Sequence, residues 1–201
     1  LDQAYDFGGA GLGKTITADA GAVLINGTDG FVSTGTFGSG AIVPSGSGTK
    51  MVWNPRTRAF RAGGVSGTQW DAINVGFGSI AFGNDTTAIG TCSMAFGFNT
   101  TASAFYSTAF GFGTTASESR STAFGSGTTS DGTNSTAFGQ NSTANATNST
   151  AFGQDTTASG VSSTAFGSNT IASAFFSTAF GKQNNAKSYS ETVFGIGATD
   201  Y

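Results

Sequence analysis

The sequence predicts an all-β fold, a parallel β-roll built from fourteen-residue coils, and three observations predict it. Ala-Phe-Gly occurs eight times between residues 81 and 181, and each copy starts fourteen residues after the last. Val193-Phe194-Gly195 adds a degenerate ninth copy at the same interval. Each unit combines Gly with β-branched Thr and lacks a 3.6-residue apolar stripe, which disfavours a helical repeat. An unbroken short period is typical of a solenoid, in which each unit is one coil stacked on its neighbours.

Each unit predicts two short strands and two turns. It reads Ser-Thr-Ala-Phe-Gly, two variable residues, Thr-Thr-Ala and four variable residues, and the units run from Ser79 to the one that begins at Glu191. We expect a strand over Ser-Thr-Ala-Phe that ends at Gly, because Gly favours a bend. A second strand is expected over Thr-Thr-Ala, followed by a turn. Like strands then stack about 4.8 Å apart, so nine coils give a rod of about 40 Å.

A ladder of phenylalanines is the main apolar feature of the repeat. Alternation along the first strand places Thr and Phe on one side and Ser, Ala and Gly on the other. A coil this thin offers little to cover nine rings, whereas a closed homo-oligomer would cover them, although periodicity does not choose between two and three subunits. The rings predicted to form the core of the roll or of the trimer are Phe82, Phe96, Phe110, Phe124, Phe138, Phe152, Phe166, Phe180 and Phe194.

The pattern Ser-x-Ala-Phe-Gly-x-x-Thr-x-Ala resembles the head repeat of the YadA-like trimeric autotransporter adhesins. That repeat has Ser, an aliphatic residue, Ala, Ile, Gly, two free residues, Ser, one free residue and Ala. The resemblance covers Ser79 to about Asp200, with Phe in place of Ile and mostly Thr in place of the aliphatic residue, which Ile80 and Met94 keep. It implies a left-handed parallel β-roll, assembled as a homotrimer in an extracellular fibre at the cell surface.

Two classes of function follow from this resemblance. The first is a non-enzymatic, structural and adhesive fibre head that binds a cell-surface or matrix protein or a glycan. The alternative is a tail-fibre receptor-binding protein of a phage or contractile injection device, because the same repeat occurs in tail-fibre-like surface proteins. The opening Leu-Asp-Gln-Ala-Tyr-Asp-Phe-Gly-Gly looks more like those proteins than like typical adhesins. Ice binding needs an outward Thr-x-Thr array, whereas the adjacent Thr pair here points to opposite faces.

Composition excludes several other classes. Charged residues make up 9% of the 201 and the net charge is −3, which leaves no basic footprint for nucleic acid. No run of 18 apolar residues exists, so no membrane span is expected. The chain has no His, and its single cysteine, Cys92, is interpreted as a small turn residue. We therefore expect no enzyme, no metal and no cofactor. Because no signal peptide is recognisable, we expect a mature chain, a fragment of a longer fibre or a virion component.

Residues 1–64 lack the fourteen-residue period and are expected to form a small β-rich module. Residues 65–78 are expected to connect this module to the roll at 79–201. Trp70 lies in the connector, where it is predicted to cover the open edge of the first coil. The strands expected in the module are Gly21–Gly27, Gly30–Gly38, Lys50–Trp53 and Arg58–Ala62, the last two paired.

One motif in this module matches the phosphate-binding P-loop. Residues 8–15, Gly-Gly-Ala-Gly-Leu-Gly-Lys-Thr, fit G-x-x-x-x-G-K-[ST]. The motif needs a buried strand before it and a helix after it, and the sequence offers neither. We interpret it as a chance match in a Gly-rich chain, and expect no role in nucleotide binding for Lys14.

A cluster of cations in the module permits two interpretations. Arg56, Arg58 and Arg61 lie near Lys50. They form either a patch for an anionic glycan or phosphate, or the outward residues of a strand pair balanced by nearby acids. We favour the second.

Aromatic residues in the turns are the candidate contact residues. Phe98 and Phe112 are expected in the first turn of their coils, and Tyr189 in a second turn. Exposed aromatic rings bind sugars or partner surfaces, and they also pack across subunit boundaries. The candidate ligand-binding residues are Phe105, Tyr106, Phe175 and Phe176.

Overall fold

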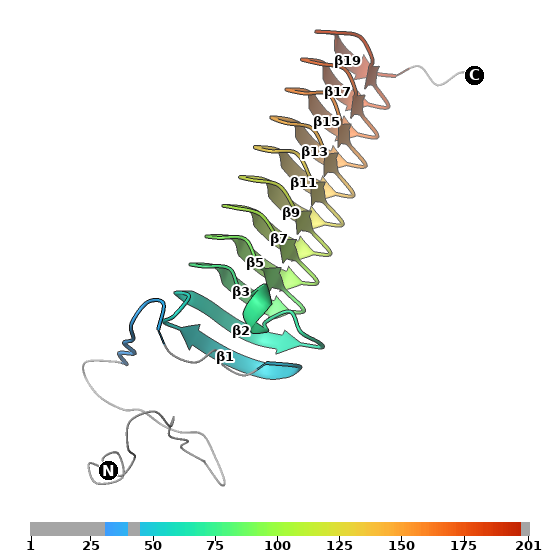
Figure 1. Cartoon of the computed structure of the whole chain (residues 1–201). Helices are drawn as coiled ribbons and strands as arrows, with labels where there is room; N and C mark the ends of the chain where they lie inside the picture. The colour runs from blue at the N-terminus through green and yellow to red at the C-terminus, as the bar shows by residue number, and fades with distance from the viewer. Residues whose placement is uncertain (1–30, 40–44, 198–201) are drawn as a thin grey trace, which may run out of the picture. The chain divides into compact units, whose positions relative to one another are not determined.

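The computed structural model describes residues 31–39 and 45–197, and Figure 1 shows their stacked coils. All the described strands belong to one compact unit, Gly35–Tyr201. They form two sheets, one of eleven strands and one of eight. The parallel β-solenoid of fourteen-residue coils is therefore confirmed.

The first strand of each coil has five residues and contributes to the eleven-stranded sheet. These strands pair in parallel and in register, so that Phe138 lies opposite Phe152 and Gly139 opposite Gly153. The expected end at Gly is wrong, because that Gly pairs with the Gly of the next coil and the strand continues one residue further. The strands are β3 (Ile80–Asn84), β5 (Met94–Phe98), β7 (Thr108–Phe112), β9 (Thr122–Ser126), β11 (Thr136–Gln140), β13 (Thr150–Gln154), β15 (Thr164–Ser168), β17 (Thr178–Lys182) and β19 (Thr192–Ile196).

The second strand of each coil has only two residues and contributes to the eight-stranded sheet. Eight coils are complete, and β19 begins a ninth that has no second strand among the described residues. The strands are β4 (Thr87–Ala88), β6 (Thr101–Ala102), β8 (Thr115–Ala116), β10 (Thr129–Ser130), β12 (Thr143–Ala144), β14 (Thr157–Ala158), β16 (Ile171–Ala172) and β18 (Asn185–Ala186).

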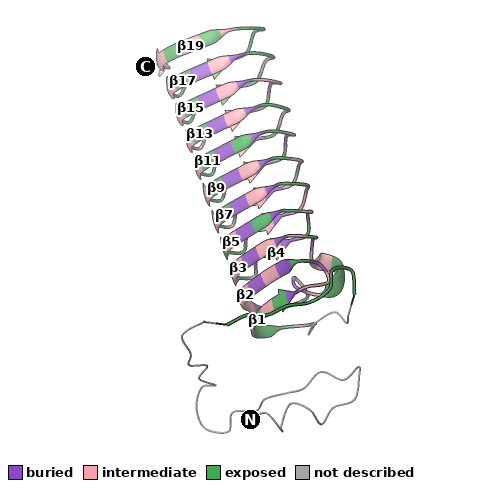
Figure 2. Ribbon diagram, turned by 90° about the vertical axis from the view of Figure 1, so that its left-hand side faces the viewer, coloured by how far each residue is buried: buried purple, intermediate pink, exposed green. Residues whose placement is uncertain are grey.

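Small side chains fill the interior of the roll. Ala137 and Ala144 are completely buried, as are Ser135 and Thr128, and the same positions of the unit are buried along the rod (Figure 2, purple). The two strands of a coil leave room between them for methyl and hydroxyl groups but not for a ring. The prediction that Phe residues form the core of the roll itself is therefore wrong, because the rings point outward.

The Gly that follows each Phe has no room for a side chain. A Cβ atom built on Gly139 would lie 1.9 Å from the carbonyl oxygen of Gly153, in a backbone with φ of +117°. L-residues rarely adopt this conformation. The residue is therefore required both by the backbone angle and by the close approach of the next coil.

Both turns of each coil contain a residue in the left-handed backbone region. At the seventh position of the unit these include Asp85, Asn99 and Gly113, which are the residue types that tolerate positive φ. At the fourteenth position they include Cys92 and Tyr106. Cys92 is exposed in its turn, as the sequence indicated.

A β-hairpin extends the large sheet at the N-terminal end of the roll. Strand β1 (Gly48–Asn54) pairs antiparallel with β2 (Ala59–Val65), which confirms the predicted pairing. Strand β2 also pairs in parallel with β3, and Gly63 lies opposite Gly83. A short 3-10 helix, η1 (Ala72–Asn74), lies between β2 and β3. Residues 31–38 form no strand, so that expectation is wrong there, whereas the strand expected at 21–27 and the P-loop-like motif lie outside the described residues.

Arg61 and Trp70 close this end of the roll. Arg61 pairs opposite Ala81, and its guanidinium donates hydrogen bonds to the Ser79 carbonyl (2.9 Å), to Ser79 Oγ (2.7 Å) and to the Ala88 carbonyl (2.9 Å). Burial lowers the pKa of Arg61 to about 10, so it stays protonated at neutral pH. Arg61 is thus neither an outward residue nor part of an anion patch, and both interpretations are wrong for it.

Trp70 is 4% exposed and donates from Nε1 to the Thr86 carbonyl at 2.8 Å. It packs with Val65 and the first core alanines. The prediction that Trp70 covers the first coil is confirmed, since a ring in this position shields the small core from water at the end of the stack.

Candidate interaction surface

The phenylalanines of the repeat stack into one column on the outer face of the large sheet. From Phe110 to Phe194 the centroids of successive rings lie 4.6–4.9 Å apart, with interplanar angles of 2–6°. At the N-terminal end the column continues through Phe96 and Phe82 to Phe60, at 5.3–6.0 Å. The in-register pairing of the strands produces this column, because it places each ring directly over its counterpart.

Stacking covers the faces of these rings but leaves their edges open. The rings from Phe110 to Phe180 are 36–45% exposed, and the terminal Phe194 is 77% exposed. If a whole Phe side chain has about 200 Å² of surface, each ring of the column leaves about 75 Å² open. The six rings from Phe110 to Phe180 then expose about 450 Å², which is within the range of the largest apolar patch on a typical monomer, a patch that often marks an interaction site.

The apolar face is wider at the second and third coils. Phe98 and Phe112 form a second stack there, with centroids 5.4 Å apart and planes within 9°. They are the last residues of β5 and β7 rather than turn residues, and are 45% and 60% exposed. Alternation along the strand could have predicted this placement, since the sixth position of the unit lies on the same side of the strand as the fourth.

A second set of exposed aromatic residues lies in the turns at the other end of the first strands. Phe105 and Tyr106 are 45% and 51% exposed, and their ring centroids are 4.1 Å apart. Phe175 and Phe176 are 55% and 53% exposed, and Phe176 meets Tyr189 edge-on at 5.7 Å. The four candidate ligand-binding residues thus form two separate pairs five coils apart, and their binding role stays a prediction.

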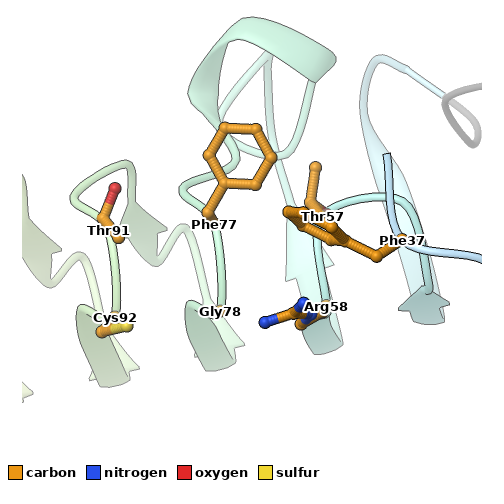
Figure 3. A pocket seen from close by; sticks show the side chains of 7 residues that line it. All are labelled: Phe37, Thr57, Arg58, Phe77, Gly78, Thr91 and Cys92. Atoms are coloured by element: carbon orange, nitrogen blue, oxygen red, sulfur yellow. The ribbon is translucent and has the colours of Figure 1, made fainter. Parts of the chain in front are cut away.

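A small pocket lies beside these turns at the N-terminal end (Figure 3). Its volume is about 130 Å³, and its lining includes Phe37, Arg58, Phe77, Gly78 and Cys92. The Phe37 and Phe77 rings meet edge-on at 5.9 Å, and the Arg58 guanidinium carbon lies 4.0 Å from the Phe37 centroid. The pocket is too small to hold more than a single compact group.

The predicted cation cluster does not form one patch. Lys50 Nζ donates to the carbonyl groups of Ser45 and Gly46, Arg58 lies over Phe37, and Arg61 is buried. In the described part of the chain, no group of three or more His, Cys, Asp or Glu side chains is placed to hold a metal ion. No helix among the same residues has the length and apolarity to cross a membrane.

Comparison with known families identifies the repeat. The model of the YadA head domain repeat matches residues 75–91, 90–113, 102–128, 130–156 and 158–187, which together are more than half of the chain. A search of curated proteins found no match. The matches span the coils described above and confirm the resemblance of the Ala-Phe-Gly repeat. YadA head domains are surface-exposed parts of structural adhesins. The chain belongs to the family of the YadA head domain repeat.

Proposed function

We propose that this chain is the head of a homotrimeric, non-enzymatic adhesive fibre that displays its roll outside the cell and binds cell-surface or matrix proteins or glycans. The observation that carries the proposal is the continuous column of half-open Phe rings along one face of the roll. Membership of the YadA head family supports three subunits rather than two.

The energy available from covering this column is sufficient for a stable assembly. Phe138 is 37% exposed, which corresponds to about 75 Å² and is worth about 2 kcal/mol when covered. The same gain applies to each of the similar rings from Phe110 to Phe180 in every subunit. Even after the entropic cost of association is subtracted, a shared apolar core of stacked rings favours a permanent assembly.

Adhesion in this proposal uses the repeated surface that remains outside the shared core. The outer side of the short strands presents Thr at the ninth position of most coils, including Thr115, Thr129 and Thr143. Identical groups repeated along a rod, and again in each subunit, give multivalent contacts from weak individual ones. The turn residues Phe105, Tyr106, Phe175 and Phe176 serve either a ligand or a neighbouring subunit.

Sedimentation of the intact chain tests the assembly. We expect a mass close to three times 20.0 kDa at micromolar concentration. Phe138→Ala should lower the melting temperature and weaken association, whereas Thr143→Ala, on the outer side of the same coil, should change neither. A stable monomer, or a Phe138→Ala protein that melts and sediments like the parent, contradicts the proposal.

Binding assays test the adhesive role. Beads coated with the trimer should attach to matrix proteins, animal cells or a glycan array, and soluble trimer should compete. Attachment only to bacterial envelopes would favour the tail-fibre alternative instead. Phe105→Ala combined with Tyr106→Ala separates the two roles of the turn residues, because a ligand site loses attachment at unchanged stability and a subunit contact loses both.

A further inference from the structure

We propose that neighbouring subunits interlock through matched side chains at the two ends of their first strands. Phe105 and Tyr106 of one subunit pack against Phe98 and Phe112 of the next, and five coils further along, the Phe176–Tyr189 pair packs against Lys182. The inference rests on the proposed trimer and names the contacts that align its subunits.

The two sets of side chains lie at opposite ends of the same strands. Phe98 and Phe112 end β5 and β7 at the first turn, whereas Phe105 and Tyr106 lie in the second turn that leads into β7. Tyr106 and Phe112 are six positions apart along a mostly extended chain, which corresponds to about 20 Å. The two sets therefore do not reach each other within one chain.

Cyclic symmetry brings these ends together between chains. A cyclic assembly relates its subunits by rotation without translation, so each coil lies at the same height in every subunit. When the outer faces of the large sheets surround a common axis, the first-turn end of one strand lies beside the second-turn end of its counterpart in the neighbour. Contacts across the boundary thus join residues of the same level.

Aromatic second turns coincide with aromatic or cationic strand ends at two places along the rod. At β5 and β7, where the second turn has Phe105 and Tyr106, the strands end in aromatic residues. At β17, the level of the Phe176–Tyr189 pair, the strand ends in the exposed cation Lys182, a partner for aromatic faces.

Between these two levels the residues at both ends are mostly polar, with Val161 in the turn after β13 as an apolar exception. The strands β9, β11 and β13 end in Ser126, Gln140 and Gln154. The left-handed residues of the corresponding second turns are Asn134, Asn148 and Ser162. Aromatic or cationic strand ends thus coincide with aromatic second turns at β5, β7 and β17, whereas β15, which precedes Phe175 and Phe176, ends in Ser168.

The backbone of the second turns provides an independent observation. Tyr106 and Phe176 have φ of +58° and +56°, and in the described part of the chain they are the aromatic residues with a left-handed backbone. Bulky side chains are disfavoured there, and four of the other six complete coils have Asn or Ser at the same position, whereas the two coils next to that of Tyr106 have Cys92 and Arg120. Within the chain each ring has one aromatic contact, Tyr106 with Phe105 and Phe176 with Tyr189, and each ring stays more than half exposed. Contact with another subunit would bury the exposed part of each ring and help to offset the strain of the left-handed backbone.

Thiol cross-linking tests the interlock. In a Cys92→Ser background, Tyr106→Cys combined with Phe112→Cys should give covalent dimers and trimers with a short bismaleimide on a denaturing gel. Either substitution alone should give none. Tyr106→Cys combined with Gln154→Cys is the matched control, because Gln154 lies three coils, about 14 Å, beyond Phe112 and should not cross-link. Phe105→Cys with Phe98→Cys is a second level-matched pair, for use if the first disturbs folding.

The outcomes separate this inference from the proposed function. Cross-linking of a level-matched pair, with none for the offset pair, supports the interlock. A protein that sediments as a trimer but cross-links neither matched pair, or cross-links the offset pair equally, overturns the interlock and leaves the fibre head intact. A protein that sediments as a monomer overturns both.

Discussion

Replacing Gly139 by Ala should lower the free energy of unfolding of the roll more than any surface substitution, because the added side chain would clash with the next coil. A Cβ atom there would lie 1.9 Å from the Gly153 carbonyl oxygen, whereas real Cβ contacts essentially never fall below 3.0 Å. The coils must therefore separate locally by more than about 1 Å, which is enough to break backbone hydrogen bonds of about 2.9 Å. Losing about three bonds between β11 and β13 costs about 3 kcal/mol, and the positive φ adds about 1–2 kcal/mol.

Gly113→Ala is the matched control for this substitution. Gly113 also has a positive φ, +61°, and also belongs to the repeats, in the first turn of its coil, but nothing lies within 4 Å of its Cβ position. Gly113→Ala should lower the free energy of unfolding only by the cost of placing Ala at a positive φ, about 1–2 kcal/mol. Urea unfolding followed by circular dichroism measures both free energies. If the two variants differ by less than about 1 kcal/mol, the close approach of the coils is not what requires Gly at the fifth position.

Three further predictions concern polar side chains of the roll and of its N-terminal end. Thr128 Oγ1 is buried without a hydrogen-bond partner, so Thr128→Val should raise the free energy of unfolding by about 1 kcal/mol in the same urea assay. Ser107→Ala should lower the free energy of unfolding by a similar amount, because it removes a hydroxyl that donates to the Ala104 carbonyl at 2.8 Å. Arg61→Ala leaves several acceptors unpaired at the N-terminal end and should cost at least about 1.5–3 kcal/mol, seen as faster amide exchange in the first coils than in the last. Hydrogen bonds from Ser66 lower the pKa of Asp85 from its ordinary value of 3.8. The ionised carboxylate therefore stabilises the fold above that pH, and the stabilisation is lost as the pH falls through the lowered pKa. The melting temperature of Asp85→Asn should consequently differ less between pH 7 and pH 3 than that of the parent.

The repeating part of the fold follows from local rules. Alternation along Thr-Ala-Phe decides that Ala137 points inward and Phe138 outward, because a strand has a period of two. The fourteen-residue spacing then places like residues over one another. The seventh position carried a further signal that the prediction did not use, since Asp85, Asn99 and Gly113 are residue types that adopt positive φ.

The N-terminal end depends on pairing that no period reveals. Residues 31–38 alternate loosely but form no strand, because alternation does not supply a partner for the backbone. Arg61 looked like a surface cation until the register of β2 against β3 placed it opposite Ala81, in line with the core.

The interaction surface was predictable as a chemical pattern but not as a geometry. The Phe ladder was evident, whereas the extra stack of Phe98 and Phe112 was assigned to turns because the strand was expected to end at Gly. Because each strand is one residue longer than expected, Phe98 and Phe112 belong to the sheet and not to the turns.

The identical fourteen-residue spacing also makes the length of the rod an adjustable quantity. Each coil meets the next through the same residues, so removing residues 121–134 would join two units whose contacting surfaces are already alike. Recombination between units would therefore lengthen or shorten the protein in whole steps of about 4.8 Å without disturbing the cap formed by Arg61 and Trp70. In such a molecule the distance between the two ends of the head can change in evolution without new kinds of contact, because each added coil brings the same stacking interface as the one before it.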